Sequence, residues 1–332
     1  MKKLFFLLAC VAMSMLSTAQ INQLVWANGR LLYGTPVAGM DSLTYDDMDD
    51  VDTLHLLLPR TLIKAVHDTV YTHDTVYVET DCGGDENTLT QGIGVFSVGE
   101  GKTVTFSKGN LQYHPANDEW RFAPSQLDYK DGANSNCSST YNGWLDLFGW
   151  STGATNFGVS TFQHNADYSG SFVDWGTNQI GSDAPNTWRT LTYDEWYYLL
   201  NTRTNASSLK GVAQVNGVNG LIFLPDNWTC PAGVTFKSGL HSSNGVNYYA
   251  AYQTFTASEW SKLESAGAVF LPAAGYRYGT IVRSVQFYGY YWSVTENTGS
   301  DAAYLHFYSG VALMDNDTDL YNGQSVRLVK DL

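Results

Sequence analysis

Cysteine is scarce in this sequence of 332 residues, which contains four, and no two of them are close neighbours. Pairs of the C-x-x-C type, which hold structural zinc, are therefore absent. Once an N-terminal leader that contains Cys10 is removed, as argued below, an odd number of cysteines remains. One Cys137–Cys230 disulfide can form in an oxidising compartment, which leaves Cys82 as a free thiol.

Basic residues are also few, since 18 Lys and Arg stand against 32 Asp and Glu and give a formal net charge of −14. The loss of Lys2 and Lys3 with the leader makes the balance more acidic still. Such a chain repels phosphate backbones, so we exclude nucleic acid as a partner. Hydrophobic residues make up 44% of the chain and aromatic residues 14%. This is material for one large core, or for one core and a small module.

Long apolar runs occur only at the N-terminus. Met1-Lys2-Lys3 is followed by an apolar run to Leu16 and by Ser17-Thr18-Ala19, which predicts a secretory signal peptide over residues 1–19. The alternative is a lipoprotein box, Leu7-Leu8-Ala9-Cys10, with a lipid anchor at Cys10, but the apolar run before Cys10 is short. No later run approaches the roughly 20 apolar residues that cross a bilayer. We therefore expect an exported protein without a membrane span, at the cell surface, associated with the outer membrane or periplasmic.

Two short segments separate the signal peptide from the main domain. Residues 20–60 read as a small β module, because Asn28-Gly29 lies between two apolar stretches as in a hairpin. Residues 61–90 contain the repeat His67-Asp68-Thr69-Val70-Tyr71 and His73-Asp74-Thr75-Val76-Tyr77, which is typical of a spacer. At about 3.3 Å per residue of strand, the two histidines lie roughly 20 Å apart, too far to share a metal ion.

The main domain, residues 91–332, combines short strand-like runs with two helical segments. Thr192 and Glu195 form a T-x-x-E capping box, as do Thr256 and Glu259, and each box is followed by Trp and Leu three residues apart. Ala303, Leu305 and Phe307 alternate with Tyr304, His306 and Tyr308, which predicts a half-buried strand. A polar loop over 315–323 and a last strand over 325–329 are expected after it. The pattern predicts the α+β class.

Five short sequence segments of this domain resemble the motifs of a known family. They are Trp188-Arg189-Thr190-Leu191-Thr192, Leu221-Ile222-Phe223-Leu224-Pro225, Ala273-Ala274-Gly275-Tyr276-Arg277, Tyr291-Trp292-Ser293 and Ser325-Val326-Arg327-Leu328-Val329. In their order the chain resembles the fibrobacter-type major paralogous domain and, more distantly, the formylglycine-generating-enzyme (sulfatase-modifying factor) branch of the C-type lectin fold. The resemblance implies a C-type lectin-like domain with two short helices, small antiparallel sheets and long loops.

The chemistry of the enzyme branch depends on a pair of copper-binding cysteines. Between Trp292 and Arg327 this sequence has no cysteine, and a soft Cu(I) ion needs thiolate-type ligands. Ser293 lies in no G-x-S-x-G elbow. We therefore expect no catalytic residues and no cofactor, and keep a degenerate or unrecognised enzyme of that superfamily as an alternative.

The C-terminal region also resembles the variable regions of retroelement-diversified proteins, which display changeable side chains on a C-type lectin scaffold. That resemblance implies a frame at Gly275-Tyr276-Arg277, Tyr291-Trp292-Ser293 and Ser325-Val326-Arg327. The residues between would bind a ligand, and they are Tyr278, Arg283, Gln286, Tyr288, Tyr290, Glu296, Tyr304, His306, Tyr308, Asp315, Asn316, Asp317, Asp319 and Tyr321. We expect Tyr288, Tyr290, Tyr304, His306 and Tyr308 to be exposed enough to bind.

Asp315, Asp317 and Asp319 supply alternating oxygen atoms, a pattern that calcium can use. The segment lacks the glycine and the glutamate of an EF-hand, because Leu320 and Val326 occupy those positions. A solvated loop is the favoured interpretation, and a calcium site is the alternative.

The tyrosines of this region favour recognition, because tyrosine gives a large contact area at low entropic cost. The sequence thus predicts a non-catalytic ligand-binding or adhesion protein with a protein or glycan ligand outside the cell. The alternatives are a carbohydrate-binding lectin and a structural component of a surface assembly.

Overall fold

The computed structural model describes five N-terminal strands and then residues 94–151 and 171–332. The chain divides into two compact units, Met1–Gly84 and Asp85–Leu332, and each is described by itself. The repeat at 67–77, Cys82 and the expected cleavage position after Ala19 lie outside the described residues.

The N-terminal unit is built from antiparallel strands. Its strands are β1 (Leu7–Cys10), β2 (Asn22–Ala27), β3 (Arg30–Pro36), β4 (Thr53–Leu58) and β5 (Thr61–Val66). β1, β2 and β3 form one sheet, and β4 pairs with β5. The pairing of Ala27 with Arg30 confirms the hairpin expected around Asn28-Gly29. β1 falls within the segment expected as a signal peptide, and β5 within the range expected as a spacer.

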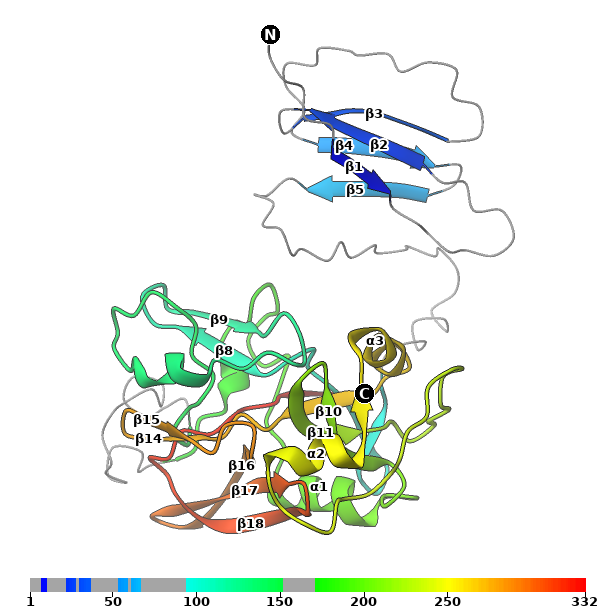
Figure 1. The fold of residues 1–332 in the computed structure, drawn as a ribbon. Helices are drawn as coiled ribbons and strands as arrows, with labels where there is room; N and C mark the ends of the chain where they lie inside the picture. The colour runs from blue at the N-terminus through cyan, green and yellow to red at the C-terminus, as the bar shows by residue number, and fades with distance from the viewer. Residues whose placement is uncertain are drawn as a thin grey trace. The chain divides into compact units, whose positions relative to one another are not determined.

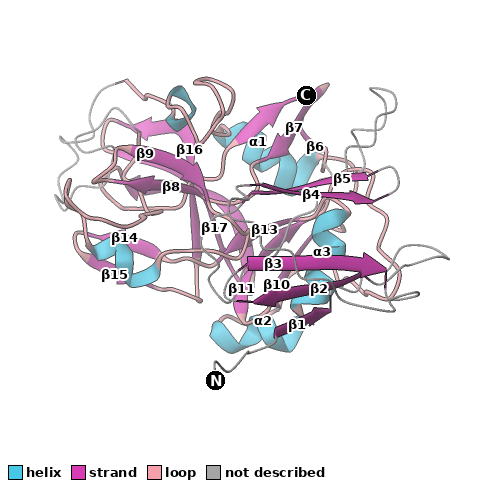
Figure 2. Cartoon of the chain, turned by 90° about the horizontal axis from the view of Figure 1, so that it is seen from above, coloured by secondary structure: helices cyan, strands magenta, loops and turns pink. Residues whose placement is uncertain are grey.

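The C-terminal unit is a mixture of short helices and several small sheets (Figures 1 and 2). Its strands are β6 (Phe96–Gly99), β7 (Lys102–Phe106), β8 (Leu111–His114), β9 (Glu119–Phe122), β10 (Lys210–Val215), β11 (Val218–Phe223), β12 (Thr254–Phe255), β13 (Val269–Pro272), β14 (Tyr276–Tyr278), β15 (Ile281–Arg283), β16 (Gly289–Thr298), β17 (Asp301–Tyr308), β18 (Val311–Asp319) and β19 (Val329–Asp331). Its α-helices are α1 (Tyr193–Tyr197), α2 (Val246–Tyr252) and α3 (Ala257–Ser265). The α+β class is thereby confirmed, and among the described residues α2 adds a third helix to the two that were expected.

Local sequence determines where α1 and α3 begin. In each helix the Thr side chain accepts from the backbone N–H of the Glu three residues later, and that Glu accepts from the Thr N–H. Both predicted capping boxes are confirmed, and each satisfies two N–H groups that a helix end leaves unpaired. Trp196 and Trp260, on the apolar faces of these helices, are buried in separate parts of the core.

The sheet β16-β17-β18 divides two parts of that core. Its inner face contributes Tyr291, Leu305 and Phe307 to a cluster that includes Trp196 of α1. At one end of the outer face Trp292 and Tyr304 join a second cluster with Phe148 and Trp150. Tyr290 packs against the margin of that second cluster, and the outer face around it carries the candidate site described below.

Two expectations about the C-terminal region were wrong in detail. β18 extends to Asp319, so the first half of the expected polar loop 315–323 is strand, because its backbone pairs with β17. The last strand begins at Val329 and pairs with β7 through Val329 and Phe106. Residues 325–328 precede this strand and make isolated backbone hydrogen bonds. One example is the Leu111 N–H, which donates to the Val326 carbonyl at 2.9 Å.

The disulfide that the sequence allows between Cys137 and Cys230 is not formed, because both are free thiols. Each thiol lies against a carbonyl of its own loop, Cys137 against Asn134 and Cys230 against Val234, both at 3.4 Å. Among the described residues, no helix has the length and apolar character needed to span a bilayer.

Candidate functional site

The outer face of the sheet β16-β17-β18 presents a continuous group of aromatic rings. The register places Tyr290 opposite His306, and His306 opposite Leu313 of β18. Because side chains alternate along a strand, these residues share the face that points away from the Leu305 and Phe307 side. The neighbouring hairpin β14-β15 adds rings from a second sheet.

We call this group the tyrosine face. Its members, whose rings contact one another, are Tyr276, Tyr288, Tyr290, Tyr304, His306 and Tyr308. Tyr278 and Tyr321 form a separate ring pair near one side of it. Tyr290 and His306 are stacked with ring centroids 4.9 Å apart and an interplanar angle of 10°. Tyr288 meets Tyr308 edge to face at 5.3 Å and 90°. Rings that support one another in this way are held in fixed orientations and gain attraction beyond their buried area.

Two glycines allow the rings to come together. A Cβ on Gly289 would meet the Phe307 ring at 2.1 Å, so only glycine lets β16 lie directly against that buried side chain between Tyr288 and Tyr290. Gly275 has a φ of 70°, and a Cβ there would meet the carbonyl of Arg283 at 2.1 Å. This turn places Tyr276 against Tyr290, with the centroids of the two rings 5.2 Å apart.

Carboxylates border the tyrosine face along β18. The Tyr304 hydroxyl donates to Asp315 Oδ2 at 3.3 Å, and the Tyr321 hydroxyl donates to Asp319 Oδ2 at 2.8 Å. Burial and then Asp315 raise the pKa of Tyr304 above its ordinary value, and burial lowers the pKa of His306. Tyr304 therefore stays neutral at physiological pH, and burial favours the neutral form of His306.

The structure brings most of the expected ligand-binding residues together. Tyr288, Tyr290, His306 and Tyr308 are half-buried and lie side by side. The exposure expected for Tyr304 was wrong, because only 8% of it is accessible. It lies opposite Trp292 at the end of the sheet that the second core cluster covers.

Hydrogen bonds within the domain hold the side chain of Gln286. Its side chain accepts from the Asn219 N–H at 2.7 Å and donates to the Tyr129 hydroxyl at 2.7 Å. Its φ of 62° and its N–H bond to Ala273 fix the turn before β16. Both ends of the amide therefore have a partner within the domain.

The remaining expected residues lie around the tyrosine face. Tyr278 and Tyr321 contact each other at one side, with the exposed Arg283 lying over the Tyr278 ring. Glu296 is exposed in the irregular part of β16. Asp317 is exposed on β18 between Asp315 and Asp319. The backbone of Asn316 belongs to β18, and its side chain is outside the described residues.

No group of three potential metal ligands of the His, Cys, Asp or Glu type comes together in the described part of the chain. Asp315 and Asp319, two of the residues considered for calcium, are hydrogen-bonded to different tyrosines.

Sequence reasoning missed two members of this surface. Tyr276 was assigned to the frame, yet its ring lies against Tyr290. Leu313 is 40% exposed beside His306 and adds an apolar contact. Its spacing of two residues from Asp315 is the strand signal that could have revealed it.

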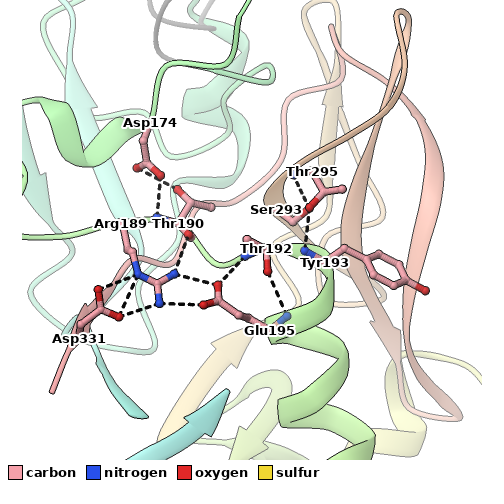
Figure 3. A network of polar contacts seen from close by, with 9 residues as sticks. All are labelled: Asp174, Arg189, Thr190, Thr192, Tyr193, Glu195, Ser293, Thr295 and Asp331. Carbon is pink, nitrogen blue, oxygen red and sulfur yellow. Dashed lines mark hydrogen bonds and ion pairs between the residues drawn. The ribbon is translucent and has the colours of Figure 1, made fainter. Parts of the chain in front are cut away.

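A polar network elsewhere in the domain has a structural role (Figure 3). Arg189 donates to both oxygens of Glu195, at 2.8 and 2.9 Å, and to Asp331 at 2.7 Å. Glu195 is also the capping residue of α1, and Asp174 accepts from the Thr190 N–H at 2.9 Å. The network ties the start of α1 to β19, and all its carboxylates have partners inside the protein.

Comparison of the chain with protein-family models, with curated proteins and with solved structures gave no match in any of the three.

Proposed function

We propose that this chain is a non-catalytic ligand-binding or adhesion protein that binds its ligand through the tyrosine face. The single observation that carries the proposal is the ring cluster on the outer side of β16-β17-β18, where Tyr288, Tyr290, His306 and Tyr308 lie side by side and are partly accessible. We further propose that the protein is exported and displayed at the cell exterior, where its partner is a protein or a glycan.

The chemistry of the tyrosine face supports recognition. The hydroxyls of Tyr288, Tyr290 and Tyr308 make no hydrogen bond within the described residues, so they remain available to a ligand. Rigid aromatic side chains lose little entropy on binding and combine apolar area with a polar tip. A rigid sheet beneath them holds the arrangement before the ligand arrives, which lowers the cost of binding.

We also propose a C-type lectin-like fold of the fibrobacter-type major paralogous branch, distantly related to formylglycine-generating enzymes, with a retroelement-diversified receptor as the more specific hypothesis. Two features support a division into frame and display surface. The frame stations Tyr291-Trp292 and Ser325-Val326 are buried and adjacent, with Trp292 N–H donating to the Ser325 carbonyl at 3.0 Å. The intervening Tyr288, Tyr290 and Tyr308 are partly accessible on the sheet surface.

A carbohydrate-binding lectin is the second candidate, because tyrosine rings also stack on the apolar faces of sugars. An enzyme of the related superfamily is less well supported. The Ser293 hydroxyl is fully buried and donates to the Ala303 carbonyl at 2.7 Å, so it is not presented as a nucleophile.

A binding screen with matched variants tests the proposal. Wild type, the double variant Tyr288→Ala/Tyr308→Ala and the control Tyr197→Ala are applied to a glycan array and to a panel of bacterial and host surface proteins. Tyr197 is a suitable control because it is 48% exposed on α1 and is not part of the tyrosine face. We expect the double variant to lose the wild-type ligands and Tyr197→Ala to keep them. Unchanged binding by a folded double variant would refute the tyrosine face as the site.

A further inference from the structure

Charge around the tyrosine face is one-sided. From Tyr276 to Tyr321 the acidic residues are Glu296, Asp301, Asp315, Asp317 and Asp319, and the basic residues are Arg277 and Arg283. Arg277 is completely buried, which leaves Arg283, beside Tyr278, as the exposed cation of this segment.

The carboxylates lie close to the rings. Asp315 contacts the Tyr304 hydroxyl, and both Asp315 and Asp317 help to raise the pKa of that hydroxyl. Asp315 also acts on His306, where its charge opposes the effect of burial. One edge of the tyrosine face therefore carries negative charge beside the cluster formed by Tyr290, His306 and Tyr304.

The orientation of the rings suits a positively charged group. Tyr288 and Tyr308 stand at 90° to each other, while Tyr290 is stacked on His306, so the surface offers ring faces in more than one direction. A Lys or Arg side chain is attracted to the face of a tyrosine, and a nearby carboxylate adds to that attraction.

The same domain also pairs cations with rings elsewhere, as two examples show. The guanidinium carbon of Arg121 lies 3.7 Å from the ring centre of Trp144, and Lys237 Nζ lies 3.9 Å from that of Tyr252. On the tyrosine face the rings and the carboxylates are present, and Arg283 lies at its Tyr278 side.

We infer that the partner of the tyrosine face is a protein segment with exposed lysine or arginine side chains, which lie on the rings while Asp315 and Asp317 balance their charge. The inference rests on the proposed function, because it names the chemistry of the ligand at the same site. β16 and β18 are the two edge strands of their sheet, and the aspartates of β18 disfavour pairing of another strand with its edge. In this inference the segment therefore lies across the face and does not pair with β18.

The probe is a fluorescent peptide of ten residues with four lysines spaced by Gly and Ser, compared with the same peptide in which glutamine replaces lysine. Binding is measured by fluorescence anisotropy at low and at physiological salt. We expect the lysine peptide to bind and the glutamine peptide to bind about tenfold more weakly or not at all. The affinity should fall as salt rises, because the carboxylates are partly exposed.

Matched variants separate specific from general attraction. Asp315→Asn/Asp317→Asn should weaken the lysine peptide about five- to tenfold, as expected for two partly exposed charge pairs. Glu100→Gln/Glu119→Gln removes the same charge from exposed positions elsewhere in the domain and should leave the affinity within about twofold.

The outcomes distinguish this inference from the proposed function. If both peptides bind alike, or neither binds, or the asparagine variant has no effect, the cationic partner is wrong. The role of the tyrosine face is then decided separately, by whether Tyr288→Ala/Tyr308→Ala loses the other ligands that the wild type binds. If the control variant weakens the lysine peptide as much as the asparagine variant does, the attraction is general and the inference is overturned.

Discussion

Gly289→Ala tests whether the close approach of β16 to Phe307 holds the tyrosine face in place. Gly289 and Phe307 are cross-strand partners, and a Cβ at Gly289 would lie 2.1 to 2.8 Å from three ring atoms of Phe307. Real contacts are never that short. Phe307 is fully buried, so its ring can move only by displacing the core around Tyr291 and Leu305.

The expected magnitude follows from two opposing effects. Forcing a methyl group into a packed core costs about 1 to 3 kcal/mol. Alanine recovers about 0.4 to 1 kcal/mol, because it restricts the unfolded chain more than glycine does. The net loss of unfolding free energy is about 1 to 2 kcal/mol, which lowers the Tm of a unit of this size by about 2 to 8 °C.

Thermal unfolding followed by circular dichroism measures this loss, with Gly299→Ala as the control. A Cβ at Gly299 meets nothing within 4 Å, so this variant should match the wild type or exceed it slightly. Phe307→Leu is expected to relieve the clash, so the effects of Gly289→Ala and Phe307→Leu should not add in a double-mutant cycle. A Gly289→Ala protein as stable as the Gly299→Ala protein, or strictly additive effects in the cycle, would refute the reasoning.

Three further predictions concern charge. Arg189 holds the pKa of Asp331 below its usual range, so this pair contributes stability above the unfolded pKa of about 3.9, which is lost as the pH falls through the lower folded pKa. Arg189→Met should lower the Tm at pH 7 and show a shallower loss below about pH 4. Burial raises the pKa of Asp146 to about 6, so stability falls as the pH rises from about 4 to 6, and Asp146→Asn should lack that fall in Tm. Isothermal titration with millimolar calcium should give no binding heat, because Asp315 and Asp319 are bonded to different tyrosines.

Each of these has a contradicting result. If the Tm of wild type and of Arg189→Met fell in parallel below about pH 4, the Arg189–Asp331 pair would not have the proposed role. Parallel Tm curves for wild type and Asp146→Asn would mean that the carboxyl titrates normally. A saturable calcium signal that disappears in Asp317→Asn would restore the calcium site.

Local patterns in the sequence predicted local structure well. The capping boxes at Thr192 and Thr256 depend on residues three positions apart, so a short window contains all the information they need. The alternation in β17 placed Leu305 and Phe307 on the buried side for the same reason.

Features that depend on distant partners were not predictable in this way. Tyr304 follows the same alternation as His306, but it is covered by the cluster around Trp150 and Phe148, which comes from a far segment of the chain. Gln286 looked like a surface residue until its bonds to Asn219 and Tyr129 were known. The aspartates of β18 are poor strand formers, and only pairing with β17 makes their backbone extended.

The pairing of β19 with β7 has a consequence for biosynthesis. Phe106 meets Val329 only after almost the whole unit has been translated, so the sheet β19-β7-β6 cannot close while the ribosome is still adding residues before β19. A nascent chain interrupted after β18 carries every strand of the tyrosine face, yet lacks the segment that joins its last part to its first. Closing of this sheet is therefore a late event in the folding of the unit, because it depends on a contact between segments far apart in the sequence.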